Sequence, residues 1–356
     1  MTDLALAPVR PFRRAARAGF RADRRGTVAV LTGLMILPLM FSAGIAVDLT
    51  RATGFRAALQ NAADSAALAG AAAYTDATQA SAAAAVATAY LQQAEAGLPP
   101  NRGVSFTVTP AVLTNAAGQT AGYTVTVTAQ AQVATTLMSL VVASMPAIAR
   151  ATAENPVVTI NATLGNWKSS AWDANTIYWY VVPPNGALPA AADLHELFTN
   201  TGPAPTTLPS IQVTAAQKIG FALQNVTGGI QGYGANQYGS PQGHTNWLYS
   251  QLSPPSASAY PTVPQNCALE VAVATAADPV PTQTGGSCSS ATPALGTVSC
   301  AQAAGETIFY FWNDMGGSAD DYDYNDAQYS LTCSAPPPAT TQTVASAAPT
   351  TVVLTN

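Results

Sequence analysis

The sequence predicts a membrane-anchored α+β protein. Its expected parts are an N-terminal transmembrane helix, an alanine-rich helical stalk that continues from it with a small antiparallel sheet, and an all-β, sandwich-like C-terminal domain. Three observations support this fold class: an uncharged apolar stretch directly after a cluster of arginines, a change from helical to period-two patterning near residue 100, and the location of all five tryptophans beyond residue 155.

Charge is scarce and unevenly distributed along the chain. Only 9% of the 356 residues are charged, whereas soluble globular domains contain about 25%, which argues against an ordinary cytosolic enzyme. The formal net charge of −5 divides into +5 for residues 1–25 and −10 for the rest of the chain. Since phosphate binding requires a basic surface, the acidic body disfavours nucleic acid as a partner.

The first expected element is a transmembrane helix over residues 26–47, which read GTVAVLTGLMILPLMFSAGIAV. A helix of this length spans about 33 Å, enough to cross a hydrocarbon core of about 30 Å. Pro38 lies in its middle, which membrane helices tolerate. By the positive-inside rule, the arginines of residues 1–25 place that segment in the cytoplasm, so the chain after Asp48 is expected on the other side.

A cleavable signal peptide is the alternative for this segment. Gly44-Ile45-Ala46 fits a small-x-small cleavage site. However, the apolar region of a signal peptide is about 7–15 residues long, which is shorter than the stretch found here. A buried core helix would not explain the adjacent arginines. The preferred interpretation is therefore an uncleaved anchor.

Residues 48–155 are expected to form helices followed by strands. Residues 48–74 continue the helical pattern without proline, and one face carries mostly alanine, which permits close approach of another helix. A second helix is expected over residues 81–96 and ends before Pro99 and Pro100. The apolar residues of the first face are Phe55, Leu59, Ala62, Ala66, Ala69 and Ala73.

The strand pattern begins at residue 104. Residues 104–109 and 123–128 alternate with period two around a turn-rich stretch at 115–118, so they predict an antiparallel pair. Residues 147–160 are expected to form a further strand that runs into the next domain.

Residues 156–333 are expected to form the exported β-domain. Short aromatic and β-branched strands at 176–181, 269–273 and 307–312 are separated by loops rich in Gly, Pro and Ser, which is typical of a β-sandwich. Residues 184–210 are interpreted as a surface insertion. Residues 334–356 form an uncharged Pro/Thr/Ala tail, which is predicted to be disordered.

All four cysteines lie in this exported part of the chain. They are Cys267, Cys288, Cys300 and Cys333. An even number of cysteines outside the cytoplasm predicts two disulfides, for which three pairings are open. A zinc site is disfavoured because the spacings contain no C-x-x-C pair.

Several motifs of the N-terminal region form a distinctive series. Residues 24–30 read RRGTVAV, the apolar span ends in Val47-Asp48, and residues 59–69 read LQNAADSAALA. These segments resemble the TadE/TadG-like proteins of Flp (tight adherence) pilus assembly, and the resemblance covers residues 24–155. It implies a single-pass protein of the bacterial inner membrane, with a cytoplasmic N-terminus, a periplasmic body and other pilus-assembly subunits as partners.

Two departures limit what the resemblance implies. Pilin-like relatives that are cut by a prepilin peptidase have Glu at the fifth position after the cleavage glycine, and Leu31 occupies that position if Gly26 is the glycine. Larger relatives often carry a von Willebrand A domain with an Asp-x-Ser-x-Ser metal motif, which this sequence lacks. Prepilin processing and metal-dependent adhesion of that type are therefore not expected.

The densest acidic segment lies between residues 314 and 326. Its candidate Ca²⁺ ligands are Asp314, Asp320, Asp321, Asp323, Asn325 and Asp326. Crowded carboxylates repel unless something neutralises them, and hard oxygen ligands suit Ca²⁺. The segment is no EF-hand, because Asp326 replaces the required glycine and Thr332 the closing glutamate. The alternative is a solvated turn whose side chains cap their own backbone.

This acidic segment also resembles the closing Asp-x-Asp-Tyr/Phe-Asn-Asp signature of an exported bacterial β-domain family of unknown function. In that family, as here at residues 309–312, an aromatic strand precedes the motif. The resemblance covers residues 215–333.

Catalytic motifs are scarce, so no enzymatic activity and no catalytic residue are expected. His195 lacks the second histidine of a zinc protease motif, and His244 lies in a Gly/Pro/Asn-rich loop. Trp172, Trp179 and Tyr180 are candidates for a carbohydrate site, although such residues more often belong to a sandwich core. The predicted function is a structural component of Flp pilus assembly. In this role the β-domain is expected to recognise an envelope or surface ligand. The alternative is an exported calcium-dependent adhesin or glycan-binding module with an N-terminal membrane anchor.

Overall fold

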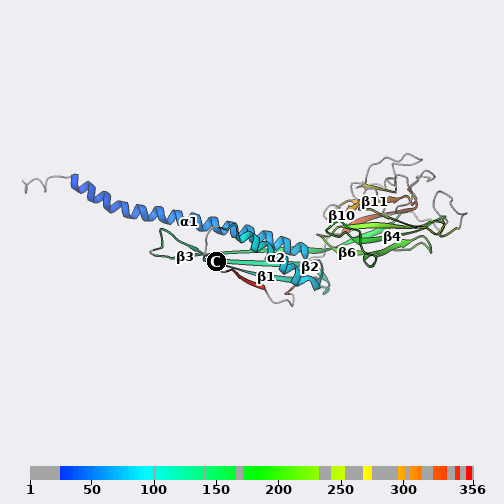
Figure 1. Ribbon diagram of the computed structural model, residues 1–356, viewed down its shortest axis with the longest axis horizontal. Coiled ribbons are helices and arrows are strands. Elements are labelled where there is room, and N and C mark those ends of the chain that lie inside the picture. Colours follow the sequence, from blue (N-terminus) through cyan, green and yellow to red (C-terminus); the bar gives the residue numbers. More distant parts are fainter. Residues whose placement is uncertain are drawn as a thin grey trace, which may run out of the picture.

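The protein is elongated, with one long helix beside a sheet and a β-domain at the far end (Figure 1). The computed structural model describes residues 25–98, 102–139, 141–165, 171–231, 242–252, 268–274, 296–300, 305–314, 324–334, 341–344 and 350–354. The helical elements are α1 (Arg25–Ala73), the 3-10 turn η1 (Ala77–Gln79), α2 (Ala80–Glu95) and the 3-10 turn η2 (Ala191–Asp193). The strands are β1 (Arg102–Thr114), β2 (Thr120–Ala134), β3 (Ser144–Leu164), β4 (Ala174–Val181), β5 (His195–Thr199), β6 (Ile211–Thr214), β7 (Ile219–Val226), β8 (Thr245–Tyr249), β9 (Leu269–Ala274), β10 (Thr297–Val298), β11 (Thr307–Trp312), β12 (Ala327–Ser334), β13 (Thr341–Val344) and β14 (Thr350–Leu354). The predicted α+β class is confirmed.

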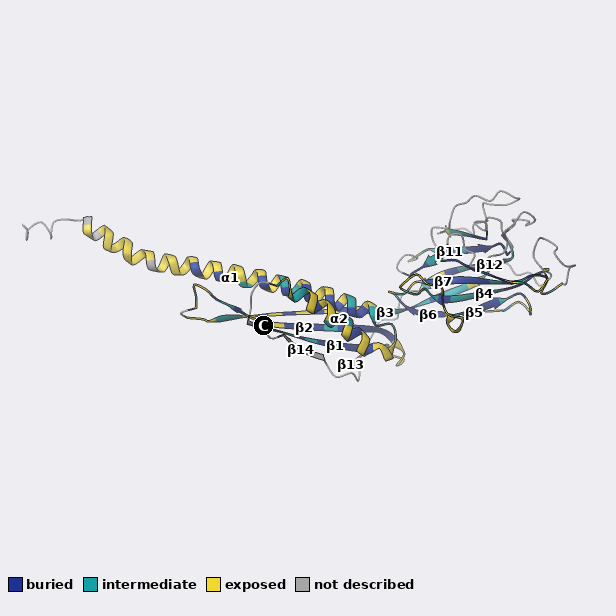
Figure 2. Cartoon of the chain, viewed as in Figure 1, coloured by how far each residue is buried: buried dark blue, intermediate teal, exposed yellow. Residues whose placement is uncertain are grey.

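Helix α1 has an exposed half and a packed half. It is 49 residues long, which corresponds to about 70 Å. Its first half carries exposed apolar side chains and is long and apolar enough to cross a membrane, whereas its second half lies against the body of the protein (Figure 2). The predicted N-terminal apolar helix is thus confirmed, and it continues without interruption into the stalk.

The stalk packs α1 and α2 on one face of the sheet formed by β1, β2 and β3. Its core is built largely from alanine. The inward residues of β3 are Ala147, Ala149, Ala151 and Ala153, all buried. Small side chains let the helix and the sheet approach closely. At Gly70 of α1, an added Cβ would lie 3.0 Å from the Cβ of Ala87 on α2.

Strand β3 belongs to both parts of the body. Its first part pairs antiparallel with β2 as far as Pro156, and its last part pairs with β6 and β12. Proline has no N–H to donate to a ladder, so Pro156 suits the point at which the pairing changes. The predicted small sheet and part of the sandwich are therefore one nine-stranded sheet. A boundary drawn between residues 155 and 156 falls inside this strand.

The C-terminal domain is formed by two facing sheets. The second sheet has five strands in the order β10-β7-β4-β5, with β8 paired to β7. The core between the sheets is aromatic: the ring centroids of Phe221 and Tyr310 lie 4.8 Å apart, and those of Tyr310 and Tyr329 lie 5.1 Å apart. Trp312 is fully buried beside them. The predicted all-β C-terminal domain is confirmed.

Two predictions about irregular segments differ from the structure. Residues 184–210 are not only a surface insertion, because they include β5, whose Leu197 and Phe198 are buried in the sandwich core. Residues 334–356, predicted to be disordered, contain β13 and β14, which both pair antiparallel with β1. The outer edge of β1 is otherwise unpaired, and the Thr- and Val-rich tail suits strand formation.

The stalk and the β-domain are joined by the side chain of Asn155, which is buried at the change of partner on β3. Its Nδ2 donates to the carbonyl of Tyr74, at the end of α1, over 3.1 Å, and its Oδ1 accepts from the N–H of Ala216, after β6, at the same distance.

We therefore expect Asn155→Ala to destabilise the protein. It removes the partner of the buried Tyr74 carbonyl and of the N–H of the exposed Ala216. Loss of the buried bond costs about 1–3 kcal/mol in the free energy of unfolding. Denaturant titration of the full chain in detergent micelles measures this. Asn185→Ala, at an exposed turn position, is the control and should change stability by less than about 0.5 kcal/mol. Equal effects of the two substitutions would contradict the role of Asn155.

Candidate functional site

Four parts of the described chain bear on function: the motif face of α1, a clamp around Asp48, a cleft between the stalk and the β-domain, and a buried polar network near the acidic segment. The first two lie on α1 and concern how this helix is attached to the sheet of the stalk. The other two concern the β-domain and the ligands predicted for it.

The motif face of α1, residues 59–69, joins the helix to the backbone of β3. The carboxamide of Gln60 donates to the carbonyl of Arg150 over 3.0 Å and accepts from the N–H of the same residue over 3.4 Å. Its second N–H donates to Asp64 over 2.9 Å, which orients the amide. Gln60 thus occupies the edge of β3 opposite β2, where none of the described strands pairs with this part of β3. An open edge of this kind would otherwise favour association with another chain.

The remaining motif positions provide the packing surface. Leu59, Ala62, Ala63, Ala66 and Ala67 are all buried. Their spacing places them on the side of α1 that contacts β2, β3 and α2. The contacts therefore account for the motif. The amide of Gln60 bonds to the strand edge, the carboxylate of Asp64 orients that amide, and the small side chains allow close packing.

Asp48 clamps the loop between β2 and β3 onto α1. Its carboxylate is buried and accepts four hydrogen bonds. These come from the N–H of Thr136 (3.0 Å), the Oγ1 of Thr136 (2.6 Å), the N–H of Leu137 (2.9 Å) and the N–H of Met138 (2.7 Å). The bond from the Thr136 hydroxyl, followed by those from the backbone, lowers the pKa of Asp48 to about 2. The predicted role of residue 48 was only to end the membrane span, so this clamp is a finding of the structure.

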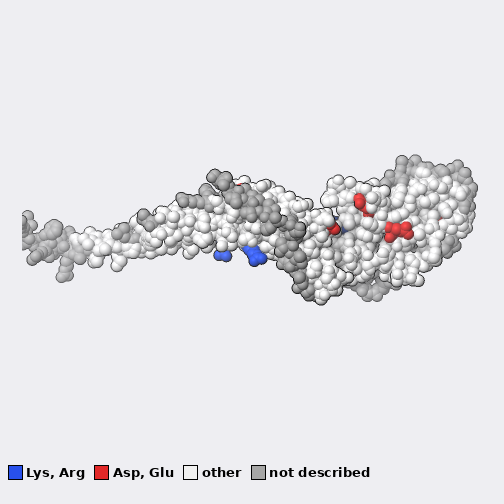
Figure 3. Space-filling model, turned by 90° about the horizontal axis from the view of Figure 1, so that it is seen from below, with Lys and Arg blue, Asp and Glu red and all other residues white. Residues whose placement is uncertain are grey.

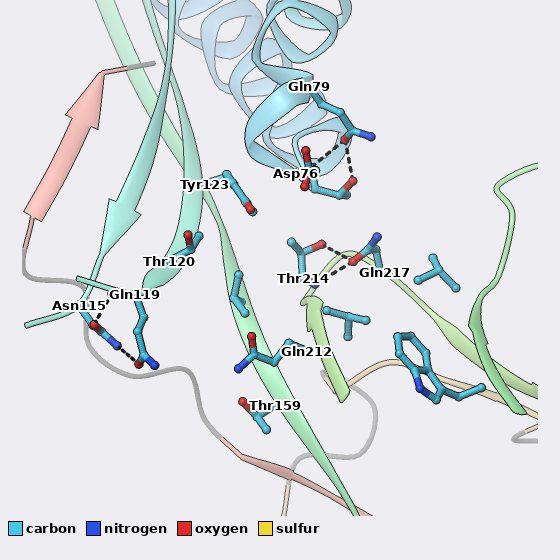
Figure 4. Close-up of a pocket in the computed structure, with 15 residues that line it drawn as sticks. Asp76, Gln79, Asn115, Gln119, Thr120, Tyr123, Thr159, Gln212, Thr214 and Gln217 are labelled. Atoms are coloured by element: carbon cyan, nitrogen blue, oxygen red, sulfur yellow. Dashed lines mark hydrogen bonds between the residues drawn. The ribbon is translucent and has the colours of Figure 1, made fainter. Parts of the chain in front are cut away.

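A polar cleft of about 700 Å³ lies between the stalk and the β-domain (Figure 4). It brings together residues from η1, the β1–β2 turn, β3, β4 and β6. Its lining comprises Thr75, Asp76, Gln79, Asn115, Gln119, Thr120, Tyr123, Val157, Thr159, Trp179, Val181, Gln212, Val213, Thr214 and Gln217. Most of these side chains are hydroxyls and carboxamides, and Asp76 is the one carboxylate of the lining.

Several cleft side chains are held by bonds to one another. Gln79 Oε1 accepts from the hydroxyl of Thr75 over 2.7 Å, and Gln217 Oε1 accepts from the N–H of Thr214 over 2.9 Å. The glutamine oxygen is the acceptor in both pairs, and the amide nitrogen lies on the other side of each side chain (Figure 4). Bonds from the side chain and backbone of Thr78 lower the pKa of Asp76, so this carboxylate is ionised at neutral pH.

Of the three aromatic residues predicted as carbohydrate candidates, the structure places one in the cleft. Trp179 lines it and stacks on His195, with ring centroids 4.4 Å apart. Tyr180 is fully buried, in the core cluster it shares with Tyr249, and Trp172 is half exposed elsewhere. The three residues therefore do not form one site.

A network of buried amides and carboxylates lies in the β-domain. Asn225 Nδ2 donates to Asp173 over 2.9 Å, and Asn175 Nδ2 donates to Asp314 over 2.8 Å. Asn225 also bonds to Asn175 and Asn246. Sequence reasoning missed this network. Asn and Asp inside strands are unusual, so Asn175, Asn225 and Asn246 carried a signal that was available in the strand pattern.

The predicted calcium ligands are only partly described. Asp320, Asp321 and Asp323 lie outside the described residues. Asp314 and Asp326 are close, since the N–H of Asp314 donates to Asp326 Oδ2 over 2.9 Å. Asn325 lies between Asp326 and Tyr324, whose φ of 52° is in the left-handed region. Within the ranges that the structure describes, no three His, Cys, Asp or Glu side chains are placed to hold a metal ion. The calcium site stays a prediction.

The structure contains a disulfide between Cys300 and Cys333, which closes the sequence between β10 and β12. Cys267 and Cys288 lie outside the described residues. One of the two predicted disulfides is therefore confirmed, and of the pairings left open by the sequence the structure shows Cys300 with Cys333.

The β-domain is much more acidic than the stalk. Residues 156–333 contain eleven acidic residues, two lysines and no arginine. On the face shown in Figure 3, the clearly visible basic side chains lie along the stalk, and most of the acidic side chains in view lie toward the β-domain.

Comparison with known proteins identifies the N-terminal region. Residues 26–73 match the family model of Flp pilus-assembly TadE/G-like proteins. The match covers α1 from its apolar half through the motif face to its last residue, so the resemblance read from the sequence is confirmed for this segment. Comparison with the curated proteins and with the solved structures gives no match.

We expect the Asp48 clamp to weaken in acid. Because the pKa of Asp48 in the folded protein, about 2, is below its ordinary value of 3.8, the stabilisation is present above about pH 4 and is lost as the pH falls toward 2. Hydrogen exchange of residues 136–138, corrected for the intrinsic rate, should show protection that decreases over this range. In the Asp48→Asn variant the same amides should be less protected from exchange, and their protection should not depend on pH in this range. Identical pH profiles for the two proteins would contradict the clamp.

Proposed function

We propose that the protein is a structural component of a Flp-type pilus-assembly system, anchored in the inner membrane with its body in the periplasm. The TadE/G-like match links the chain to Flp pilus assembly. The observation that carries the proposal is the division of the matched helix: one half exposes apolar side chains, and the other half is packed into a folded body.

The charge pattern supports this orientation. Seven arginines precede the apolar half of α1, and such clusters remain on the cytoplasmic side. The disulfide between Cys300 and Cys333 supports an oxidising compartment for the β-domain. Both observations favour a body outside the cytoplasm.

The architecture suits a structural role. The unbroken helix α1, the sheet beside it and the shared strand β3 form one continuous path from the apolar segment to the β-domain. A rod of this kind holds the β-domain at a fixed distance from the bilayer, where it can contact other subunits of the machine. The acidic, arginine-free β-domain favours basic or neutral polar partners.

Membrane anchoring is tested by carbonate extraction of cell membranes. We expect the protein to remain in the membrane pellet and its body to be cleaved by protease added to spheroplasts. Leu34→Asp combined with Met35→Asp should release the protein, since each charge at mid-span costs about 2.5–3.5 kcal/mol. The matched control, Leu34→Ala with Met35→Ala, should remain in the pellet.

The assembly role is tested in the same cells. Loss of the gene, or the releasing double aspartate variant, should abolish surface pili, whereas the alanine pair should support them. Normal piliation without the protein would overturn the proposal, as would protection of the body from protease in spheroplasts.

A second candidate function, binding of a glycan, is favoured by the cleft. Hydroxyl and carboxamide side chains beside the rings of Trp179 and Tyr123 suit a neutral polar ligand. The amide groups of Gln79 and Gln217 are oriented by their bonds to Thr75 and Thr214. They can therefore donate to the oxygens of a sugar.

Glycan binding is tested on an array of envelope and surface glycans. If the cleft is the site, Trp179→Ala should weaken binding at least tenfold, whereas Trp172→Ala, a half-exposed tryptophan outside the cleft, should not. Absence of binding by the wild-type protein, or equal loss in the two variants, would contradict this candidate.

A further inference from the structure

The two hairpin turns of the stalk sheet differ in chemistry. The β1–β2 turn, residues 115–119, reads Asn-Ala-Ala-Gly-Gln, an ordinary polar turn. The β2–β3 loop, residues 135–143, reads Thr-Thr-Leu-Met-Ser-Leu-Val-Val-Ala and carries no charge. In this loop Leu137 is 57% exposed and Val141 is 69% exposed. Because the strands are antiparallel, the two turns lie at opposite ends of the sheet.

The apolar loop lies at the level of the apolar half of α1. Gly44 and Asp48 are one helical turn apart on the same face, and both are buried under the loop. A Cβ added to Gly44 would lie only 2.7 Å from the Cβ of Leu137, so Leu137 sits directly on this glycine. Gly44 belongs to the uncharged stretch of residues 26–47. The loop therefore lies beside the last turn of that stretch, an overlap of about 5 Å along the helix axis. Figure 1 shows the loop extending along α1 toward its apolar end.

Polar groups hold the loop from the side of the body. Asp48 accepts the N–H groups of Leu137 and Met138, and the guanidinium of Arg51 donates to Thr136 over 3.2 Å. The charged groups thus lie on the body side of the loop. On the other side, the side chain of Leu137 lies against Gly44 of the apolar stretch.

Several backbone groups of the described part of the loop form hydrogen bonds within the loop itself. The N–H groups of Val141 and Val142 both donate to the carbonyl of Met138, over 2.8 and 2.9 Å. The N–H of Thr135 donates to Ala143, and its hydroxyl donates to Val142. Backbone that enters an apolar phase needs its hydrogen bonds made within the protein, and these bonds contribute to that requirement.

We propose that the β2–β3 loop is a second membrane contact, which inserts Leu137, Val141 and Val142 into the lipid beside α1. The inference rests on the proposed membrane anchoring. Lipid is the occupant that the geometry favours, because the exposed side chains of the loop continue the exposed apolar surface of α1 at the same level. A helix alone leaves the body free to rotate and tilt, whereas a helix and a loop together fix its orientation on the bilayer.

The test uses the full chain in vesicles of phosphatidylethanolamine and phosphatidylglycerol. An environment-sensitive fluorophore is attached at Val141→Cys, or at Ala117→Cys in the polar turn as the matched control, with the unsubstituted protein giving the background. Lipids that carry a nitroxide near the top of the acyl chain should quench the label at 141 at least twofold more than the label at 117.

Substitutions at two glycines test whether insertion of the loop depends on the contact between Leu137 and Gly44. Gly44→Leu keeps the helix apolar but displaces Leu137, so the label at 141 should be quenched no more than that at 117. Gly33 has open space around it. The matched control, Gly33→Leu, should therefore leave the quenching unchanged. Unchanged quenching with Gly44→Leu would contradict the proposal that the contact of Leu137 with Gly44 positions the loop.

The outcomes separate this proposal from the proposed function. If carbonate removes the wild-type protein from membranes, the anchoring itself fails. If the protein is retained but the label at 141 remains as accessible to water as the label at 117, the anchor holds and the loop proposal is overturned.

Discussion

Close packing between α1 and β3 through alanine side chains is the contact on which the remaining structure depends. Alanine at Ala63, Ala66 and Ala67 of the helix, and along the inner face of β3, brings the two backbones near enough for Gln60 to bond to the strand edge. Larger side chains would hold the helix away and break this bond. Because α1 is unbroken from residue 25 to residue 73, fixing its packed half also fixes the direction of its apolar half.

The shared strand β3 transmits this alignment to the β-domain. A flexible linker at the same place would let the two parts reorient freely, whereas a strand that pairs with β2 at one end and with β12 at the other holds them in register. Asn155 adds a side-chain link between α1 and the turn after β6 at the point where Pro156 interrupts the ladder. The polar cleft lies at this junction, so its shape depends on the same contacts.

The buried network of the β-domain shows how carboxylates are accommodated where arginine is lacking. Asp173 and Asp314 receive bonds from the amides of Asn225 and Asn175, and such amides satisfy a buried carboxylate without an opposing charge. The network includes Asp314, the first residue of the acidic segment. The start of that segment is therefore set by the strands around it.

The motif segments of the sequence already showed the resemblance to TadE/G-like proteins. The sequence by itself also determined the features that depend on local pattern: the long apolar helix, the alanine-rich helices, the first strand pair and the aromatic strands of the sandwich. Each follows from periodicity or composition within a few turns or strands. Tertiary structure alone decided the features that join distant residues. Asp48 and Thr136 meet only because β2 and β3 fold back along α1, and the pairing of Cys300 with Cys333 depends on where β12 lies. Likewise β13 and β14 are strands because β1 offers an open edge. Such contacts are set by backbone approach in three dimensions, which a pattern along the chain does not record.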